Sequence, residues 1–175
     1  GVDKVVFFGQ QYYIRKYLIN EFNKGFFHTP EEEVVKKYLH RMNNYLPKGS
    51  KITADHISAL HKLGYLPICI MSLPEGVSTP IKVPQSVIYN TLPEFFWLVN
   101  YVETLSSTTI WMMCTSATIA KEYNKIFTQY ALETVGDANF VPWQGHDFSM
   151  RGMAGVEAAM MSGAAHLTSF VGTDT

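Results

Sequence analysis

The sequence predicts an α/β protein, with a mixed α+β portion over residues 1–138 and the opening of an α/β portion over residues 139–175. Helix-period patterns, punctuated by Pro and Gly, occupy much of the first portion, and short apolar runs typical of strands lie between them. The last portion follows the order strand, small-residue helix, strand. That order is typical of a βαβ unit, whose two strands are parallel.

The first portion begins with two helix patterns. Residues 5–18 carry apolar side chains at helical spacing. The second helix has a strong start signal, because Thr29 is a good N-cap, Pro30 suits the first helical position and Glu32 completes a capping box. We expect this helix to run to about Leu46.

A third helix and two strands follow. Thr53 is the expected cap of the helix, and Gly64 is its expected end. Residues 66–73 and 86–90 are short apolar runs that indicate strands, and the prolines around them prevent one long element.

The rest of the chain predicts two helices and then the βαβ unit. The helix patterns cover residues 93–107 and 109–134. The unit is expected to consist of a strand at 140–148, a helix rich in Ala, Met and Gly at 153–164, and a strand at 166–170.

Composition and charge exclude several classes of function. A formal net charge of −1, with scattered Lys and Arg, gives no basic surface for nucleic acid. No uninterrupted apolar stretch approaches the about 18 residues of a transmembrane helix, and the first residues do not resemble a signal peptide. Cys69 and Cys114 lack the spacing of a zinc or redox site, so we expect buried, reduced thiols in a cytoplasmic protein.

Polar and charged residues gather where the two strands of the βαβ unit are expected to end. These are residues 146–148 and residues 172–174. In an α/β barrel, functional residues occupy the carboxyl ends of the strands. Arg151 and Asp174 are therefore expected to face one cleft, with a small-residue helix packed closely behind it.

Several segments of this sequence resemble nicotinamide phosphoribosyltransferases. HDFSMRG at residues 146–152 is similar to the family's H-D-F-x-x-R-G segment, and AHL followed by FVGTDT at 165–175 is similar to its A-H-L…F-x-G-T-D-T segment. FGQQY at 8–12 with KYL at 16–18, and WLVNYVET at 97–104, resemble further family segments in the same order.

The resemblance implies an incomplete α/β barrel of the nicotinate/nicotinamide phosphoribosyltransferase type. These enzymes transfer phosphoribose from phosphoribosyl pyrophosphate to nicotinamide, and they release nicotinamide mononucleotide and pyrophosphate in NAD salvage. The active site lies at the subunit boundary of a homodimer. Mg²⁺ is expected with phosphoribosyl pyrophosphate, and ATP is a candidate activator.

The resemblance also assigns roles to three residues. Phe148 would stack on the pyridine ring, Asp174 would accept a hydrogen bond from the nicotinamide amide, and Arg151 would contact the phosphate or pyrophosphate. An ionised carboxylate only accepts hydrogen bonds, so Asp174 suits the amide and repels nicotinic acid. Ordinary structural roles are open for each: Phe148 in the core, Arg151 in an ion pair with Asp147 or Glu157, and Asp174 as a loop cap.

The histidines, and Asp147 beside His146, are expected to have structural roles. His146 and Asp147 are candidates for orienting the strand end by hydrogen bonds, and His166 is expected to be a core histidine. His56 and His61 are five residues apart, which is not the spacing of a helical zinc pair, so no metal ligands are predicted.

The family chain is several hundred residues long, and this sequence stops directly after Asp174. We therefore expect an N-terminal-to-middle piece of the enzyme that has no transferase activity alone. Two other hypotheses remain: a nicotinate phosphoribosyltransferase with the same fold, and a non-catalytic dimerisation or regulatory module. The reading frame beyond Thr175 and the choice between the two pyridines separate them.

Overall fold

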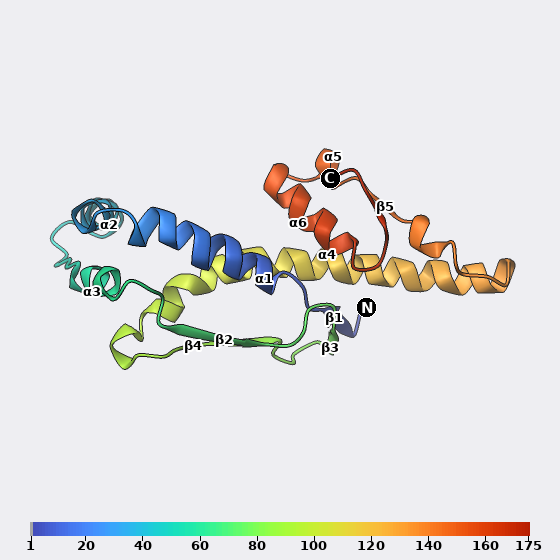
Figure 1. The fold of residues 1–175 in the computed structure, drawn as a ribbon, viewed down its shortest axis with the longest axis horizontal. Helices are drawn as coiled ribbons and strands as arrows, with labels where there is room; N and C mark the ends of the chain where they lie inside the picture. The colour runs from blue at the N-terminus through green and yellow to red at the C-terminus, as the bar shows by residue number, and fades with distance from the viewer. Residues whose placement is uncertain (1) are drawn as a thin grey trace. The chain divides into compact units, whose positions relative to one another are not determined.

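A computed structural model describes residues 2–175 and contains both helices and strands (Figure 1). The strands are short and form separate two-stranded sheets, so the structure is of the mixed α+β kind. In chain order the elements are β1 (Lys4–Val6), α1 (Gln10–Tyr13), two π-helical segments (Ile14–Glu21 and Asn23–Phe27), α2 (Glu31–Tyr45), α3 (Asp55–Leu63), β2 (Ile68–Ser72), β3 (Ser78–Pro80), β4 (Ser86–Asn90), a 3₁₀ turn (Pro93–Phe95), α4 (Leu98–Thr134), a second 3₁₀ turn (Val141–Trp143), β5 (His146–Asp147), α5 (Ser149–Gly152), α6 (Val156–His166) and β6 (Gly172–Thr173).

The chain divides into two compact units. Unit 1 runs up to Gln10 and includes Met71–Val87 and Glu103–Thr175, whereas unit 2 holds Gln11–Ile70 and Ile88–Val102. The division predicted from the sequence, an α+β portion followed by the start of a barrel, stays a prediction. All candidate site residues belong to unit 1.

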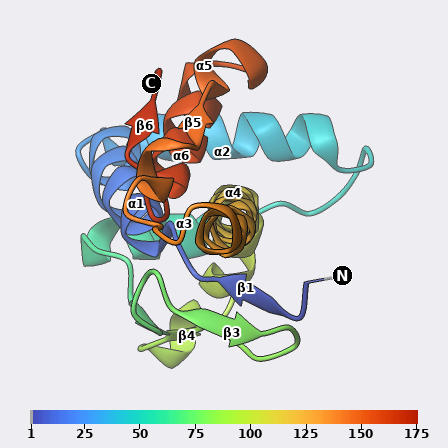
Figure 2. The same cartoon turned by 90° about the vertical axis from the view of Figure 1, so that its right-hand side faces the viewer.

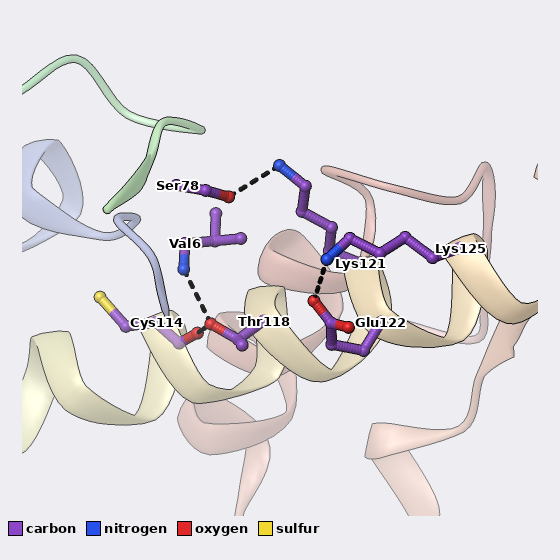
Figure 3. A network of polar contacts seen from close by, with 7 residues as sticks. All are labelled: Val6, Ser78, Cys114, Thr118, Lys121, Glu122 and Lys125. Atoms are coloured by element: carbon purple, nitrogen blue, oxygen red, sulfur yellow. Dashed lines mark hydrogen bonds and ion pairs between the residues drawn. The ribbon is translucent and has the colours of Figure 1, made fainter. Parts of the chain in front are cut away.

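Within unit 1, α4 lies between the β1–β3 pair and the C-terminal elements (Figure 2). On the strand side, the Val6 amide donates to Thr118 Oγ1 at 2.9 Å, and the Thr118 hydroxyl donates to the Cys114 carbonyl at 2.6 Å (Figure 3). Lys121 Nζ donates to Ser78 Oγ at 2.7 Å. One turn of α4 therefore fixes both antiparallel strands.

The first predicted helix, over residues 5–18, is wrong at its start. Residues 4–6 form β1, which pairs with the unpredicted strand β3, and helical structure begins only at Gln10. The β-branched side chains of Val5 and Val6 favour an extended backbone. Gly9 then turns the chain at φ +105°, a conformation that side chains rarely adopt.

On the opposite side of α4, hydrogen bonds hold α6 and the turn that follows it. The Ser116 and Ser162 hydroxyls lie 3.1 Å apart, and Asn124 Nδ2 donates to the Ser169 carbonyl at 2.9 Å. The buried residues of α6 are mostly small, as the sequence predicted, and they are Ala159, Met161, Ser162, Gly163 and Ala165.

Unit 2 contains α2 and α3, and the capping predictions for these helices are wrong. The Thr29 hydroxyl donates to the Lys24 carbonyl at 3.2 Å and does not cap α2, so the box with Glu32 does not form. Likewise Ala54, not Thr53, precedes α3, and it makes no side-chain cap.

The middle of the chain follows the sequence more closely. Gly64 ends α3 in the left-handed conformation at φ +81°, as predicted. The predicted strands over 66–73 and 86–90 are confirmed as β2 and β4. The two helices predicted over 93–107 and 109–134 are one helix, α4, which is preceded by the 3₁₀ turn.

The C-terminal segment keeps the predicted order but not the predicted bounds. The strand expected over 140–148 is reduced to β5, because Pro142 has no amide hydrogen for a strand ladder and lies in a 3₁₀ turn. The strand expected over 166–170 is wrong, since α6 continues to His166 and β6 begins only at Gly172.

No helix within residues 2–175 combines the length and the apolar character that a membrane crossing requires. Both cysteines are free thiols, as predicted. Cys114 is buried, but Cys69 is only half-buried.

Candidate functional site

Two parallel strands bring the predicted site residues together. His146 of β5 pairs with Gly172 of β6, and Asp147 pairs with Thr173. This parallel pairing across α6 confirms the predicted βαβ order. Because Phe148 and Asp174 directly follow the paired residues, both leave the sheet at the same edge.

Asp147 is the centre of the hydrogen bonds at this edge. Its Oδ1 accepts from the Ser149 hydroxyl, and its Oδ2 accepts from Thr173 Oγ1 at 2.8 Å. Its backbone carbonyl accepts from the Asp174 amide at 3.0 Å. Asp147 therefore orients the strand end, as predicted.

Hydrogen bonds also keep the Asp147 carboxylate charged. Partial burial raises the pKa of Asp147, but the hydrogen bonds from Ser149 and Thr173, together with the charge of His166, outweigh burial, so the pKa lies below its ordinary value.

Phe148, Arg151 and Asp174 form one group beyond the strand ends. Arg151 Nε lies 4.0 Å from Asp174 Oδ2, and the guanidinium carbon lies 5.5 Å from the centre of the Phe148 ring. Asp174 Oδ1 accepts from the Met150 amide at 3.3 Å. The guanidinium thus contacts both the carboxylate and the aromatic ring.

The structure decides differently on the ordinary structural roles that the sequence left open for Phe148, Arg151 and Asp174. Phe148 is not a core residue, because 54% of it is exposed. Arg151 does form an ion pair, but with Asp174 rather than with Asp147. Asp174 does act as a cap through the Met150 amide. Its carboxylate can accept further hydrogen bonds, because two oxygens offer about four acceptor positions. The roles of the three residues toward a substrate stay predictions.

A cavity of about 460 Å³ lies in unit 1, and of these three residues Phe148 lines it whereas Arg151 and Asp174 do not. Its size falls within the usual range for small-molecule sites, about 300–1,000 Å³. Asp147 and Phe148 line it from the strand end, together with His166 of α6 and the aromatic side chains of Tyr123 and Phe127 from α4.

The two histidines near the site contact aromatic rings. His166 stacks on Phe170 at 4.9 Å between ring centres, and its Nε2 lies 3.3 Å from the Gly145 carbonyl. It is a partly buried structural histidine, close to the predicted role. His146 lies 4.8 Å from the Phe148 ring.

Thr173 and Ser149 are the site residues that the sequence interpretation missed. Both are hydroxyl donors to the same carboxylate. The available signal was weak: Ser149 stands two residues after Asp147, a spacing typical of local side-chain turns. Among residues 2–175, no group of three or more His, Cys, Asp or Glu side chains could hold a metal ion.

Sequence comparisons identify the class of protein. The chain is 49% identical over 172 residues to the nicotinamide phosphoribosyltransferase of Acinetobacter baylyi. The aligned stretch covers 98% of this chain and 34% of that enzyme. It is 37% identical over 121 residues to the enzyme of the same name from Mycoplasma genitalium, covering 67% of this chain and 27% of the relative. No profile of a known protein family matches the chain.

The names of these relatives describe enzymes that transfer a phosphoribosyl group. Over the stretch that it shares with them, the chain is homologous to proteins named nicotinamide phosphoribosyltransferase. The chain spans about a third of the length of the Acinetobacter relative.

Proposed function

We propose that the complete protein containing this chain is a nicotinamide phosphoribosyltransferase. It transfers phosphoribose from phosphoribosyl pyrophosphate to nicotinamide and yields nicotinamide mononucleotide and pyrophosphate. The observation that carries this proposal is the 49% identity over 98% of the chain to an enzyme of that name. The chain supplies one wall of the nicotinamide pocket.

The partial exposure of Phe148 supports a stacking role for this residue. The pyridine ring of nicotinamide is flat and electron-poor, so it suits an aromatic face that is not already covered by the core. In this proposal Asp174 accepts a hydrogen bond from the nicotinamide NH₂ group, and Arg151 Nε lies 4.0 Å from its Oδ2.

Arg151 is proposed to bind the phosphate or pyrophosphate of the second substrate. Its side chain is 78% exposed, so its remaining donors are accessible to phosphate oxygens. A planar guanidinium binds such oxygens in pairs. Arg151 would therefore connect the two substrates, since the same group contacts Asp174 and lies over Phe148.

Catalysis in this proposal consists mainly of positioning and charge stabilisation. Pyrophosphate leaves while positive character develops on the ribose, and Arg151 and Asp174 hold the reacting groups in line. Bound with the diphosphate of phosphoribosyl pyrophosphate, Mg²⁺ would supply positive charge to the leaving group, and phosphate oxygens would be its main ligands.

The remaining proposals follow from the family. The β5–α6–β6 unit would open an α/β barrel, and the active site would be completed at the subunit boundary of a homodimer. ATP would act as an activator. The protein would work in the cytoplasm, with no nucleic acid or membrane partner.

A nicotinate phosphoribosyltransferase is the second candidate. Asp174 argues against it, because its carboxylate is already anionic beside the place proposed for the amide. Nicotinic acid would bring a second negative charge to that place and leave both charges poorly paired.

The test is an assay of the purified complete gene product with nicotinamide and with nicotinic acid, each with phosphoribosyl pyrophosphate and Mg²⁺. We expect nicotinamide mononucleotide to be the preferred product. A higher kcat/KM for nicotinic acid would assign the protein to the second candidate, and no product from either pyridine would remove both.

A further inference from the structure

Asp147 connects the two strands that carry the proposed pocket residues. Its carboxylate receives one hydroxyl from its own strand end, Ser149, and one from the neighbouring strand, Thr173. Phe148 and Asp174 each stand one residue beyond this connection. A change in the Asp147–Thr173 contact would therefore shift both of them relative to each other.

We propose that Asp147 and Thr173 are positioning residues that set the separation between Phe148 and Asp174. This inference rests on the proposed function, because it takes Phe148 as the ring contact and Asp174 as the amide contact. Neither positioning residue needs to touch a substrate. Their hydrogen bond fixes the relative place of the two groups that do.

Backbone contacts support this role. The Asp174 amide donates to the Asp147 carbonyl at 3.0 Å, and the Thr175 amide donates to Thr173 Oγ1 at 3.1 Å. Thr173 Oγ1 therefore donates to the neighbouring strand and accepts from its own loop. Asp174 therefore lies between two fixed points, its own amide on Asp147 and the Thr175 amide on Thr173.

Helix α6 packs closely against the Asp147–Thr173 hydrogen bond. Gly163 lies so close that a Cβ there would be 3.1 Å from Thr173 Oγ1 and 3.2 Å from Asp147 Oδ2. Only a glycine allows the helix backbone to approach to this distance without displacing either atom. The close approach leaves the two side chains little room to take another arrangement.

The contact requires a hydroxyl at position 173 and an acceptor at position 147. An ionised carboxylate accepts from both hydroxyls at once, whereas an asparagine side chain has only one carbonyl oxygen. Thr173→Val preserves the shape of the side chain but removes its hydroxyl. Thr173→Ser preserves the hydroxyl and removes a methyl group.

The experiment compares Thr173→Val, Thr173→Ser and Asp147→Asn in the complete gene product, with Asp137→Asn as the matched control. Asp137 is an exposed loop residue whose carboxylate accepts from the nearby Asn139 amide. For Thr173→Val and Asp147→Asn we expect the KM for nicotinamide to rise about tenfold, the effect of losing a hydrogen bond to a charged group. The KM for phosphoribosyl pyrophosphate should change less than about twofold.

Thr173→Ser should keep the KM for nicotinamide within about twofold of the wild-type value, because serine retains the hydroxyl. A purely structural role would instead lower Tm and change both KM values by a common factor. That common factor, or wild-type kinetics in Thr173→Val, would overturn the inference.

A second measurement separates this inference from the proposed function. Amide hydrogen exchange of residues 146–151 and 171–175 needs no activity. We expect both segments to exchange faster in Thr173→Val and Asp147→Asn than in Thr173→Ser. A wild-type protein without transferase activity would remove the proposed function, whereas unchanged exchange in all variants would remove the positioning role.

Discussion

Arg151 and Asp174, which are separated by α6 in the sequence, meet beyond the ends of two parallel strands with 4.0 Å between Nε and Oδ2. The pair is asymmetric: the Arg151 side chain is 78% exposed and that of Asp174 only 16%. The less exposed partner, Asp174, is held by the Met150 amide and by its own backbone contact with Asp147, and the exposed partner, Arg151, is accessible to a ligand.

Replacement of Arg151 separates its functional and structural roles. We expect Arg151→Ala to raise the KM for phosphoribosyl pyrophosphate by about tenfold or more, because a charged donor to phosphate is lost. The free energy of unfolding should change by less than about 1 kcal/mol, since an exposed ion pair contributes little. Steady-state kinetics and urea unfolding of the complete protein measure both. A large loss of stability with an unchanged KM would identify Arg151 as a structural residue.

Gly163→Ala tests the close approach of α6 to the site. The new Cβ would lie 3.1 Å from Thr173 Oγ1, so the neighbours must shift. We expect a loss of about 1 kcal/mol or more in the free energy of unfolding, together with a higher KM for nicotinamide. Gly25→Ala is the matched control, because a Cβ there meets no atom within 4 Å. Equal stability of the two variants would argue against close packing at Gly163.

Gly9→Ala tests the turn that separates β1 from the first helix. Gly9 has φ +105°, and a Cβ there would lie 2.6 Å from Met113 Sδ. Gly49 has a similar φ of +92°, but a Cβ there meets no atom within 4 Å. We expect Gly49→Ala to cost about 1 kcal/mol from backbone strain and Gly9→Ala to cost clearly more. Thermal unfolding compares the two, and a larger loss from Gly49→Ala would contradict the packing of Gly9 against α4.

The lowered pKa of Asp147 predicts a pH dependence of stability. A carboxyl whose pKa is lower in the folded state stabilises that state above its unfolded pKa, which is about 3.9 for Asp, and this contribution disappears as the pH falls through the folded pKa. The stability difference between wild type and Asp147→Asn should therefore be constant above about pH 5 and shrink below it. Urea unfolding across this range measures the difference. A constant difference down to pH 3 would contradict the effect of the Ser149 and Thr173 hydrogen bonds.

The sequence predicted some elements from local signals, but it missed strand β1 and misplaced the caps of α2 and α3. Gly64 ends α3 as predicted, because a left-handed cap is a local property of glycine. Strand β1 was missed because its partner β3 lies some seventy residues further along the chain. Thr29 has the right residue type for a cap, but its hydroxyl donates to the Lys24 carbonyl instead.

The candidate site could be predicted in part. The order strand, helix, strand correctly indicated that Arg151 and Asp174 would lie close together, since parallel strands end at the same edge, but neither residue lines the cavity of unit 1. The connection between Asp147 and Thr173 could not be predicted, because it depends on the register of β5 against β6. The sequence pattern placed a strand over 166–170, which does not contain Thr173.

The most direct test of the proposed pocket is the substrate preference of Asp174→Ser in the complete protein, measured as kcat/KM for nicotinamide and for nicotinic acid. Asp137→Ser is the control for loss of a carboxylate away from the site. We expect Asp174→Ser to lower kcat/KM for nicotinamide by the equivalent of about 1–3 kcal/mol and to raise it for nicotinic acid, because the amide loses its acceptor and the acid loses a repelling charge. Unchanged kinetics with both pyridines would show that Asp174 does not contact the base.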